Sequence, residues 1–321
     1  MTILTITGAL ALAILLILRL APRPKLDAKT LQTRVPKDLN PQELDDWLST
    51  EEMSQDNVIK GAEARIFWAN QPEKTELCVL YIHGFSASRQ EISPVPEKIG
   101  RALSANLVCA RLAGHGISKR SMQASAEDWL QSVTDAWDIA ARIGKKIIII
   151  AVSTGAPLSI WLTQRPFTRS ALHCLLFVSP NFQIRNRFAF ILTWPWARAW
   201  APKLLGAERS WEPENELVAR YWSSRYSINA VIEMQKVVDW VRLTRLDSYQ
   251  IPLATLYMKG DPTINHQAAI AFHNTWQANP KELIRVTLDP ENIQHVFTGN
   301  ISAPHRVDWT VETCLKFVRS V

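Results

Sequence analysis

The chain has 321 residues, 47% of them apolar, which is enough to bury the core of one α/β domain with an insertion. Its formal net charge of +6 comes from 36 basic and 30 acidic residues. The basic residues are scattered, which argues against a nucleic-acid-binding protein, whereas a mild positive excess suits an anionic membrane surface. The four cysteines lie in apolar segments without Cys-x-x-Cys or Cys/His spacing, so we expect them to be free and buried, with no metal site.

The amino terminus begins with an uncharged apolar segment, residues 2–18. As a helix it would be about 26 Å long, which is just enough to cross a thin bilayer. No basic side chain precedes it, and Arg19, Arg23 and Lys25 follow it. This order predicts an uncleaved single transmembrane anchor over residues 1–20; a cleaved signal peptide, which normally has a basic region before its apolar run, is the alternative.

The charges after this segment also predict the side of the membrane. Positively charged residues close to a span are retained in the cytoplasm. Because the basic residues follow the span, the amino terminus is expected outside and the rest of the chain in the cytoplasm. The opposite orientation, with the domain on the periplasmic or extracellular face, is the alternative.

The next part of the chain predicts a layered α/β core. Residues 21–55 are expected to form a linker, which lifts the domain off the membrane, and a short helix over 41–54. Expected strands cover residues 62–69, 77–82, 107–112, 147–150, 174–178, 253–258 and 283–288, and expected helices cover 90–103, 126–143, 156–164, 267–278 and 307–318. Repeated βα units with short connections predict a mostly parallel sheet with helices on both faces. This core would comprise residues 56–180 and 251–321.

Residues 181–250 interrupt this alternation. They contain six of the chain's 13 tryptophans, and a connection of this length is expected to be a lid or a small inserted cap domain. The segment 188–196 is too apolar for a solvated loop, so it should pack over the sheet, line an acyl pocket or touch lipid. Alternatively, about half of these aromatic residues form the core of the insertion itself.

The stretch 145–164, KKIIIIAVSTGAPLSIWLTQ, has the pattern of a buried strand, a tight turn and a helix. Ser153 lies at the apex of the turn, and the small residues Ala151 and Gly155 allow the strand and helix to approach closely. Such a nucleophile elbow holds a serine hydroxyl at the carboxyl end of the sheet, beside a helix N-terminus. The usual pentapeptide has glycine in place of Ala151, and an ordinary strand-to-helix turn is the alternative.

Other short motifs occur around this turn in a particular order. They are HGFSASRQE from His83, ARLAGHG from Ala110, AVSTG from Ala151, YMKGDPTIN from Tyr257 and ENIQHV from Glu291. As a set they resemble the α/β-hydrolase superfamily, in its bacterial carboxylesterase, monoacylglycerol-lipase and lysophospholipase-like branch, which also includes serine-aminopeptidase-like members. The resemblance covers about residue 62 to the C-terminus.

The resemblance implies a catalytic triad. Ser153 would be the nucleophile and Asp261 the acid, and Asp261 follows an expected strand, where parallel sheets place their sites. His295 lies in the loop after the last expected strand and completes the chain order Ser, Asp, His that this fold uses. Asp289 and Glu291 flank the histidine and are the alternative acids.

Further residues are expected around these three. The N–H groups of Phe85 and Thr154 would form the oxyanion hole, and Trp194 and Trp196 would line the substrate pocket. Arg89 and Glu91 could contact the substrate or, alternatively, form a structural pair. No cofactor and no metal ion are required.

Three functions agree with these features. The first is a membrane-anchored serine hydrolase that cleaves acylglycerols, lysolipids or similar carboxylic esters through an acyl-enzyme. The second is a peptidase or amidase of the same fold, for which Glu208, Glu212, Glu214 and Glu216 could bind a free amine. The third is a catalytically silent binding module. The expected partners are an ester substrate and the membrane.

Overall fold

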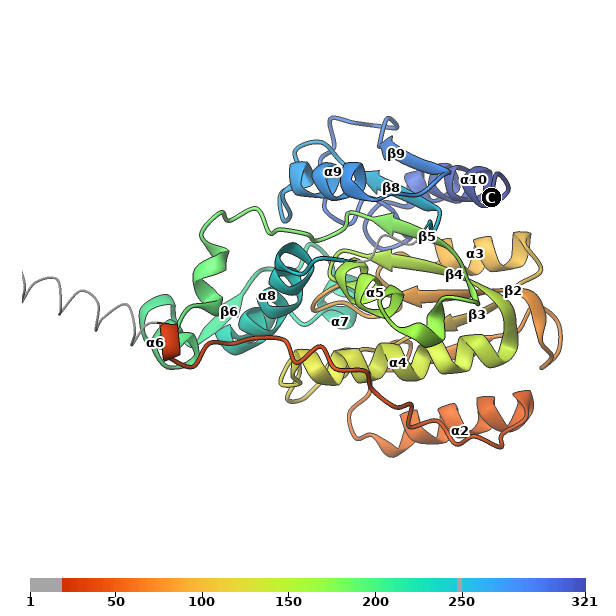
Figure 1. The fold of residues 1–321 in the computed structure, drawn as a ribbon, viewed down its shortest axis with the longest axis horizontal. Coiled ribbons are helices and arrows are strands. Elements are labelled where there is room, and N and C mark those ends of the chain that lie inside the picture. Colours follow the sequence, from red (N-terminus) through yellow and green to blue (C-terminus); the bar gives the residue numbers. More distant parts are fainter. Residues whose placement is uncertain (1–18, 247–249) are drawn as a thin grey trace, which may run out of the picture.

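A central sheet organises the chain in the computed structural model, which describes residues 19–246 and 250–321, and within those residues the sheet has seven strands (Figure 1). Their order across the sheet is β1-β3-β2-β4-β5-β8-β9, with β1 antiparallel to β3 and all other neighbours parallel. The strands are β1 (Arg65–Phe67), β2 (Thr75–Ile82), β3 (Asn106–Cys109), β4 (Gly144–Val152), β5 (Leu172–Val178), β8 (Leu253–Tyr257) and β9 (Lys281–Arg285). The expected mostly parallel sheet is confirmed.

The four isoleucines of β4 show why this sheet is buried on both faces. Ile147 and Ile149 belong to the core layer on one side of the sheet, and Ile148 and Ile150 belong to the layer on the other side. All four side chains are completely buried. Because successive side chains of a strand point to opposite faces, only a sheet covered on both sides can bury such a run.

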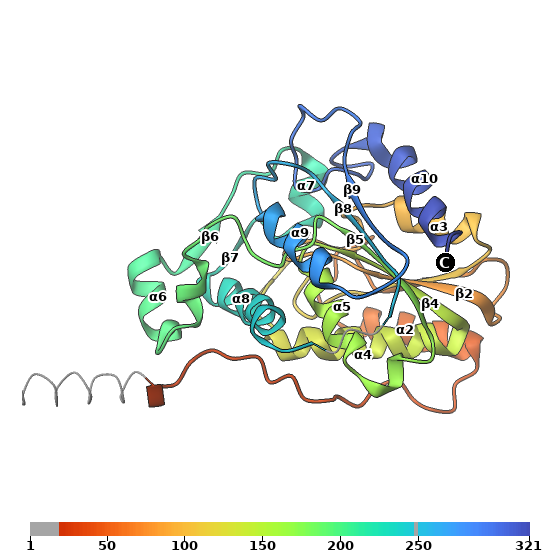
Figure 2. The same cartoon turned by 45° about the horizontal axis from the view of Figure 1, so that its top comes forward.

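Helices cover both faces, as the sequence predicted (Figures 1 and 2). The helices α4 (Ala126–Ile143), α5 (Gly155–Thr163) and α9 (His266–Thr275) pack on one face, and α3 (Val95–Ala102) and α10 (Val307–Val318) pack on the other. A capping box at Ser125 and Asp128 starts α4, because each side chain accepts a backbone N–H of the other residue. The short turns η1 (Pro166–Thr168) and η3 (Pro304–Arg306) connect the remaining elements.

The helix expected over 90–103 begins later, at Val95. Two prolines explain the difference, because proline has no N–H to donate and is tolerated only in the first turn of a helix. Pro94 therefore lies just before α3, and Pro96 lies in its first turn. Residues 84–94 form turns instead, and these turns contribute to the site described below.

Residues 21–40 do not stand away from the domain, in contrast to the expected linker. The segment lies along α4 and α5: the backbone N–H of Arg34 donates to Asp135 at 2.8 Å, and Arg165 donates to the carbonyl of Ala28 at 3.0 Å. Val35 is buried against the same core. These contacts satisfy the backbone of a segment without regular structure. The helix α2 (Pro41–Ser54) follows with the predicted bounds.

The predicted membrane anchor falls on residues 1–20, of which only the last two are among the described residues. Within residues 19–246 and 250–321, the structure contains no helix that is long and apolar enough to cross a membrane.

The insertion between β5 and β8 forms several short elements at one end of the molecule (Figure 2). They are η2 (Ala189–Thr193), α6 (Ala197–Leu205), the hairpin strands β6 (Glu208–Ser210) and β7 (Arg225–Ser227), α7 (Glu216–Tyr221) between them, and α8 (Ile228–Leu243). A buried charge cluster joins α8 to α4: Lys236 binds both Glu233 and Glu127, at 2.7 and 2.8 Å. Glu233 also accepts the N–H of Ala126, the first residue of α4, at 2.9 Å. The insertion is therefore firmly attached to the core.

Candidate active site

Ser153 lies in a tight turn between β4 and α5. Its backbone has a positive φ of 49°, a left-handed conformation that is unusual for serine. Its N–H donates to the carbonyl of Val178 at 3.0 Å, which fixes the turn to the neighbouring strand. A methyl group at Gly155 would stand only 2.4 Å from the carbonyl oxygen of Ile82, so this position requires glycine. This geometry is that of a nucleophile elbow, with Ala151 accommodated in place of the usual glycine.

The structure brings Ser153, His295 and Asp261 into one hydrogen-bonded chain. The Ser153 hydroxyl lies 2.9 Å from Nε2 of His295, and Nδ1 of His295 lies 2.8 Å from Oδ2 of Asp261. The other carboxylate oxygen of Asp261 accepts the N–H groups of Thr263 and Ile264, at 2.8 and 2.9 Å. A carboxylate can only accept, so Nδ1 carries the imidazole proton and Nε2 is left to accept from the serine. This is the arrangement that a general base needs.

The two expected oxyanion donors, Phe85 and Thr154, line the same cavity as Ser153. Thr154 precedes the first turn of α5, and Phe85 follows Gly84 in the loop after β2. Among the described residues, neither N–H group donates a hydrogen bond to a backbone carbonyl. The phenyl ring of Phe85 packs edge-on against Tyr226 of the insertion, with ring centres 5.1 Å apart. Both N–H groups are thus available to a substrate oxygen.

The polar groups of the loop after β2 are held by buried side chains. His83 donates from Nδ1 to the carbonyl of Gly84 at 2.8 Å and accepts the N–H of Leu112 at Nε2, 3.2 Å away. Burial lowers the pKa of His83 to about 4, so the ring is neutral, as this bonding requires. Glu91 accepts the N–H of Gly84 at 2.7 Å. The expected pair of Arg89 and Glu91 does not form, because Arg89 binds Glu63 at 2.9 Å.

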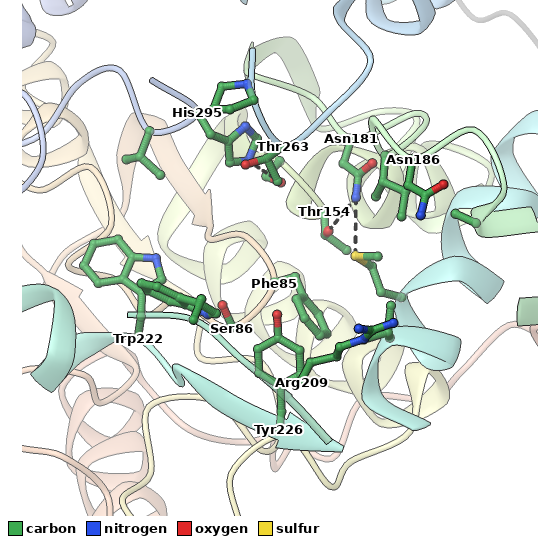
Figure 3. Close-up of a pocket in the computed structure, with 18 of the residues that line it drawn as sticks. Phe85, Ser86, Thr154, Asn181, Asn186, Arg209, Trp222, Tyr226, Thr263 and His295 are labelled. Carbon is green, nitrogen blue, oxygen red and sulfur yellow. Dashed lines mark hydrogen bonds between the residues drawn. The ribbon is translucent and has the colours of Figure 1, made fainter. Parts of the chain in front are cut away.

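A cavity of about 990 Å³ has Ser153 in its lining, and Figure 3 shows this cavity with many of its other lining residues. The core contributes Phe85, Thr154 and His295 to its lining, and the insertion contributes Trp211, Trp222, Tyr226 and Met234 among others. In Figure 3, His295, Thr263 and Asn181 lie on one side of the cavity, and Trp222, Ser86 and Tyr226 lie on the other. Most of the lining side chains are apolar, which is typical of a site for an apolar ligand.

Residues 79–297, more than half of the chain, match the alpha/beta hydrolase family. The chain belongs to this family.

Solved structures of similar proteins support the same fold. A structure from the metagenome-derived lipolytic enzymes LipS and LipT is 20% identical, with a TM-score of 0.66, and the match covers 82% of this chain and all of that one. The monoacylglycerol lipase of Paleococcus ferrophilus is 14% identical, with a TM-score of 0.59 over 80% of this chain and 98% of that one. The monoglyceride lipase of Saccharomyces cerevisiae, solved as a soluble variant in complex with a substrate analogue, is 10% identical. Its TM-score is 0.57, and the match covers 80% of this chain and 91% of that one. A search of curated protein sequences returned no match.

The alternative acids of this α/β-hydrolase lie away from the histidine. Asp289 faces His305 and Arg306, at 3.2 and 3.5 Å, and Glu291 is exposed to solvent. The geometry therefore favours Asp261 as the partner of His295.

Arg306 helps to hold the loop before His295, and the sequence did not indicate this role. It is completely buried and donates to the carbonyls of Leu288, Asp289 and Asn292, at 3.0, 2.6 and 2.8 Å. These carbonyls belong to the loop that leads into His295, so the guanidinium holds this loop in place. A lone arginine before a helix gives no sequence signal for this role.

Trp194 and Trp196 do not line the cavity, in contrast to the prediction. Their side chains are 51% and 44% exposed, on the outer face of the insertion. The inner face of α6 is occupied by the small residues Ala197 and Ala201, which pack against α8. The neighbouring tryptophans are therefore turned outward, and Trp211 and Trp222 supply the aromatic wall instead.

Among the residues that the structure describes, no group of three or more His, Cys, Asp or Glu side chains is placed to hold a metal ion.

Proposed function

We propose that this α/β-hydrolase cleaves carboxylic esters with an apolar acyl group through an acyl-enzyme on Ser153. One observation carries the proposal: the hydrogen-bonded chain from Ser153 through His295 to Asp261 lies at the floor of a large, mostly apolar cavity. The proposed nucleophile, base and orienting acid thus form a continuous chain of hydrogen bonds, and the cavity beside them has room for a substrate.

In the proposed reaction His295 removes the proton of the Ser153 hydroxyl as the oxygen attacks the ester carbonyl carbon. The carbonyl oxygen becomes an oxyanion that accepts hydrogen bonds from the N–H groups of Phe85 and Thr154. Asp261 orients the ring and stabilises the imidazolium. The imidazolium returns its proton to the departing alcohol, which leaves the acyl group on Ser153. Water, activated by the same histidine, then releases the acid.

The cavity supports a substrate with a long or bulky apolar part, such as an acylglycerol or a lysolipid. A volume of about 990 Å³ exceeds what a short ester needs. The insertion, residues 181–250, would act as the cap that encloses this part of the substrate over a core of residues 56–180 and 251–321. The lipases among the structural relatives agree with this substrate class.

The outer face of the insertion supports a membrane location. Phe190, Trp194 and Trp196 lie outside the cavity lining and are between 41% and 51% exposed there. The N–H of Trp196 donates to the carbonyl of Pro22 at 2.9 Å, so the described segment that follows the predicted anchor packs at this face. Tryptophan is favoured at membrane interfaces.

We propose that residues 2–18 anchor the enzyme with this face toward the lipid and the domain in the cytoplasm. Protease added to intact spheroplasts should then leave the domain uncut until the membrane is broken, whereas cleavage in intact spheroplasts would place the domain outside.

The amidase alternative has less support. Of the four glutamates that could bind a free amine, Glu208 is paired with Arg225, and only Glu214 is among the described residues that line the cavity. With only one of these four glutamates at a mainly apolar cavity, a free amine has few partners there, which favours an ester substrate.

Hydrolysis of p-nitrophenyl esters and p-nitroanilides by the wild type and by Ser153→Ala tests the proposal. The wild type should cleave the esters much faster than the anilides. Ser153→Ala should lose at least about a thousandfold in kcat, because the nucleophile is absent. A loss of tenfold or less would exclude Ser153 as the nucleophile, and faster anilide cleavage would favour the amidase.

A further inference from the structure

A buried carboxyl group lies next to the candidate oxyanion hole without a place in the triad. We propose that Glu91 is a positioning residue for this hole: it anchors the N–H of Gly84 so that the next N–H along the chain, that of Phe85, keeps its direction toward the reacting oxygen. The inference rests on the proposed function, because it takes Phe85 as an oxyanion donor.

The contacts of Glu91 are short and shielded from water. Its Oε2 accepts the N–H of Gly84 at 2.7 Å and the hydroxyl of Tyr81 at 3.4 Å. The residue is only 2% exposed, and it forms part of the cavity lining close to Ser153. A methyl group at Gly84 would stand 2.7 Å from Oε1 of Glu91 and 3.0 Å from Cβ of Ser153. Glutamate, glycine and serine are therefore packed in direct contact.

The two peptide groups around Gly84 are each held by one side chain. Glu91 holds the group between residues 83 and 84 through its N–H. His83 holds the following group through the carbonyl of Gly84, at 2.8 Å. This second group also contains the N–H of Phe85, which points away from the carbonyl across a planar trans peptide. Glycine has wide conformational freedom, so fixing both of its peptide groups is what sets the direction of the Phe85 N–H.

The environment of Glu91 indicates that hydrogen bonding, rather than charge, is its contribution. Among the described residues, no lysine or arginine forms an ion pair with Glu91, and the nearby Arg89 binds Glu63 instead. The titratable groups that interact with Glu91 are the imidazole of His295 and the hydroxyl of Tyr81. Burial raises the pKa of Glu91 to about 7. The carboxyl group can accept the Gly84 N–H in either protonation state, and a neutral side chain avoids repulsion of the oxyanion. A glutamine at position 91 should therefore perform the same role.

Three substitutions of Glu91 separate the effect of its hydrogen bond to Gly84 from the effect of its charge. Glu91→Gln keeps an acceptor oxygen at the same reach, Glu91→Met removes it, and Glu91→Asp keeps the charge but shortens the side chain. Glu97→Gln is the matched control, because this nearby carboxylate of α3 accepts the Ser93 hydroxyl and lies outside the cavity lining. For each protein, kcat and KM are measured with a p-nitrophenyl ester, and thermal unfolding shows that the variant is folded.

We expect Glu91→Met and Glu91→Asp to lower kcat by roughly ten- to a hundredfold, with KM changed less than about threefold, because the hole acts only in the transition state. Glu91→Gln should stay within about threefold of the wild type in kcat, and Glu97→Gln should change neither constant. If Glu91→Met does not fold, Glu91→Asp decides.

Unchanged kcat in the folded Met and Asp variants, while the wild type hydrolyses esters, would overturn the inference and leave the proposed function standing. Equal losses in the Gln and Met variants would also overturn it, because they would assign the effect to charge. A wild type without esterase activity would contradict the proposed function, and this inference with it.

Discussion

At the scale of single residues, the site depends on positions where the backbone leaves almost no choice. Ser153 has a left-handed backbone conformation, and no side chain larger than hydrogen fits at Gly155 against the carbonyl of Ile82. Substitution of Gly155 would change the turn as well as the side chain, whereas Ser153→Ala removes only the hydroxyl group. The turn, the two backbone bonds to Asp261 and the bond to His295 therefore fix the three polar groups relative to one another.

Replacing the acid should separate orientation from nucleophilicity. Asp261→Asn leaves Ser153 and His295 in place but no longer selects the tautomer with the proton on Nδ1, so kcat/KM should fall by about a thousandfold or more. Asp289→Asn is the control, because Asp289 faces His305 and Arg306, and it should lose less than about fivefold. Ester hydrolysis at pH 8 provides the comparison, and a larger loss in Asp289→Asn would show that the wrong carboxylate has been assigned.

Glu91 should also make the free energy of unfolding depend on pH. Its pKa of about 7 in the folded protein lies above the ordinary value of 4.5, because burial disfavours the charge. The group therefore takes up a proton on folding, and the stability that it contributes is full below pH 4.5 and lost as the pH rises through 7.

Relative to Glu91→Gln, the wild type should lose about 2 kcal/mol of unfolding free energy between pH 5.5 and pH 8. Urea unfolding of both proteins at the two pH values measures this difference. A difference that does not change with pH would mean that Glu91 keeps an ordinary pKa in the folded state.

At the scale of secondary-structure elements, the insertion has two aromatic faces with different surroundings. Trp222 and Tyr226 face the cavity. The next residue after Trp222, Ser223, donates its N–H to the carbonyl of Ser86 in the loop after β2, at 2.7 Å. Trp194 and Trp196 face outward. The two groups of residues can be tested separately.

Trp222→Ala should remove part of the wall that contacts the acyl chain. The ratio of kcat/KM for long to short p-nitrophenyl esters should fall by about fivefold or more, while acetate hydrolysis changes little. Trp194→Ala, as the matched tryptophan outside the cavity, should leave the ratio unchanged. The reverse pattern would mean that the outer tryptophans contact the substrate.

The elements also show where sequence reasoning succeeds. The bounds of α2, α4 and α10 agree with the prediction because caps and one-sided apolar patterns are local signals. The predicted start of α3 at residue 90 was wrong, because Pro94 and Pro96 allow the helix to begin only at Val95. The orientation of Trp194 and Trp196 depends on how α6 packs against α8, and this contact has no local signature.

At the scale of the whole molecule, segments far apart in sequence converge on the carboxyl ends of the parallel strands. The order of motifs along the chain predicted that Ser153, Asp261 and His295 meet, because parallel strands bring their following loops to one edge. It did not indicate Arg306, and it indicated Glu91 only as a possible substrate contact or a partner of Arg89. Both side chains instead bind backbone groups of irregular loops, which have no local sequence pattern. The packing of residues 21–40 along α4 and α5 also depends on long-range contacts.

Labelling with a fluorophosphonate, followed by mass spectrometry of the digested protein, tests the central claim most directly. The reagent forms a covalent adduct only with a serine that a nearby base activates. The wild type should carry one adduct on Ser153, and His295→Ala should label at least about a hundredfold more slowly while remaining folded. A wild type that stays unlabelled, or an adduct on another residue, would contradict the assignment of Ser153 as the activated nucleophile.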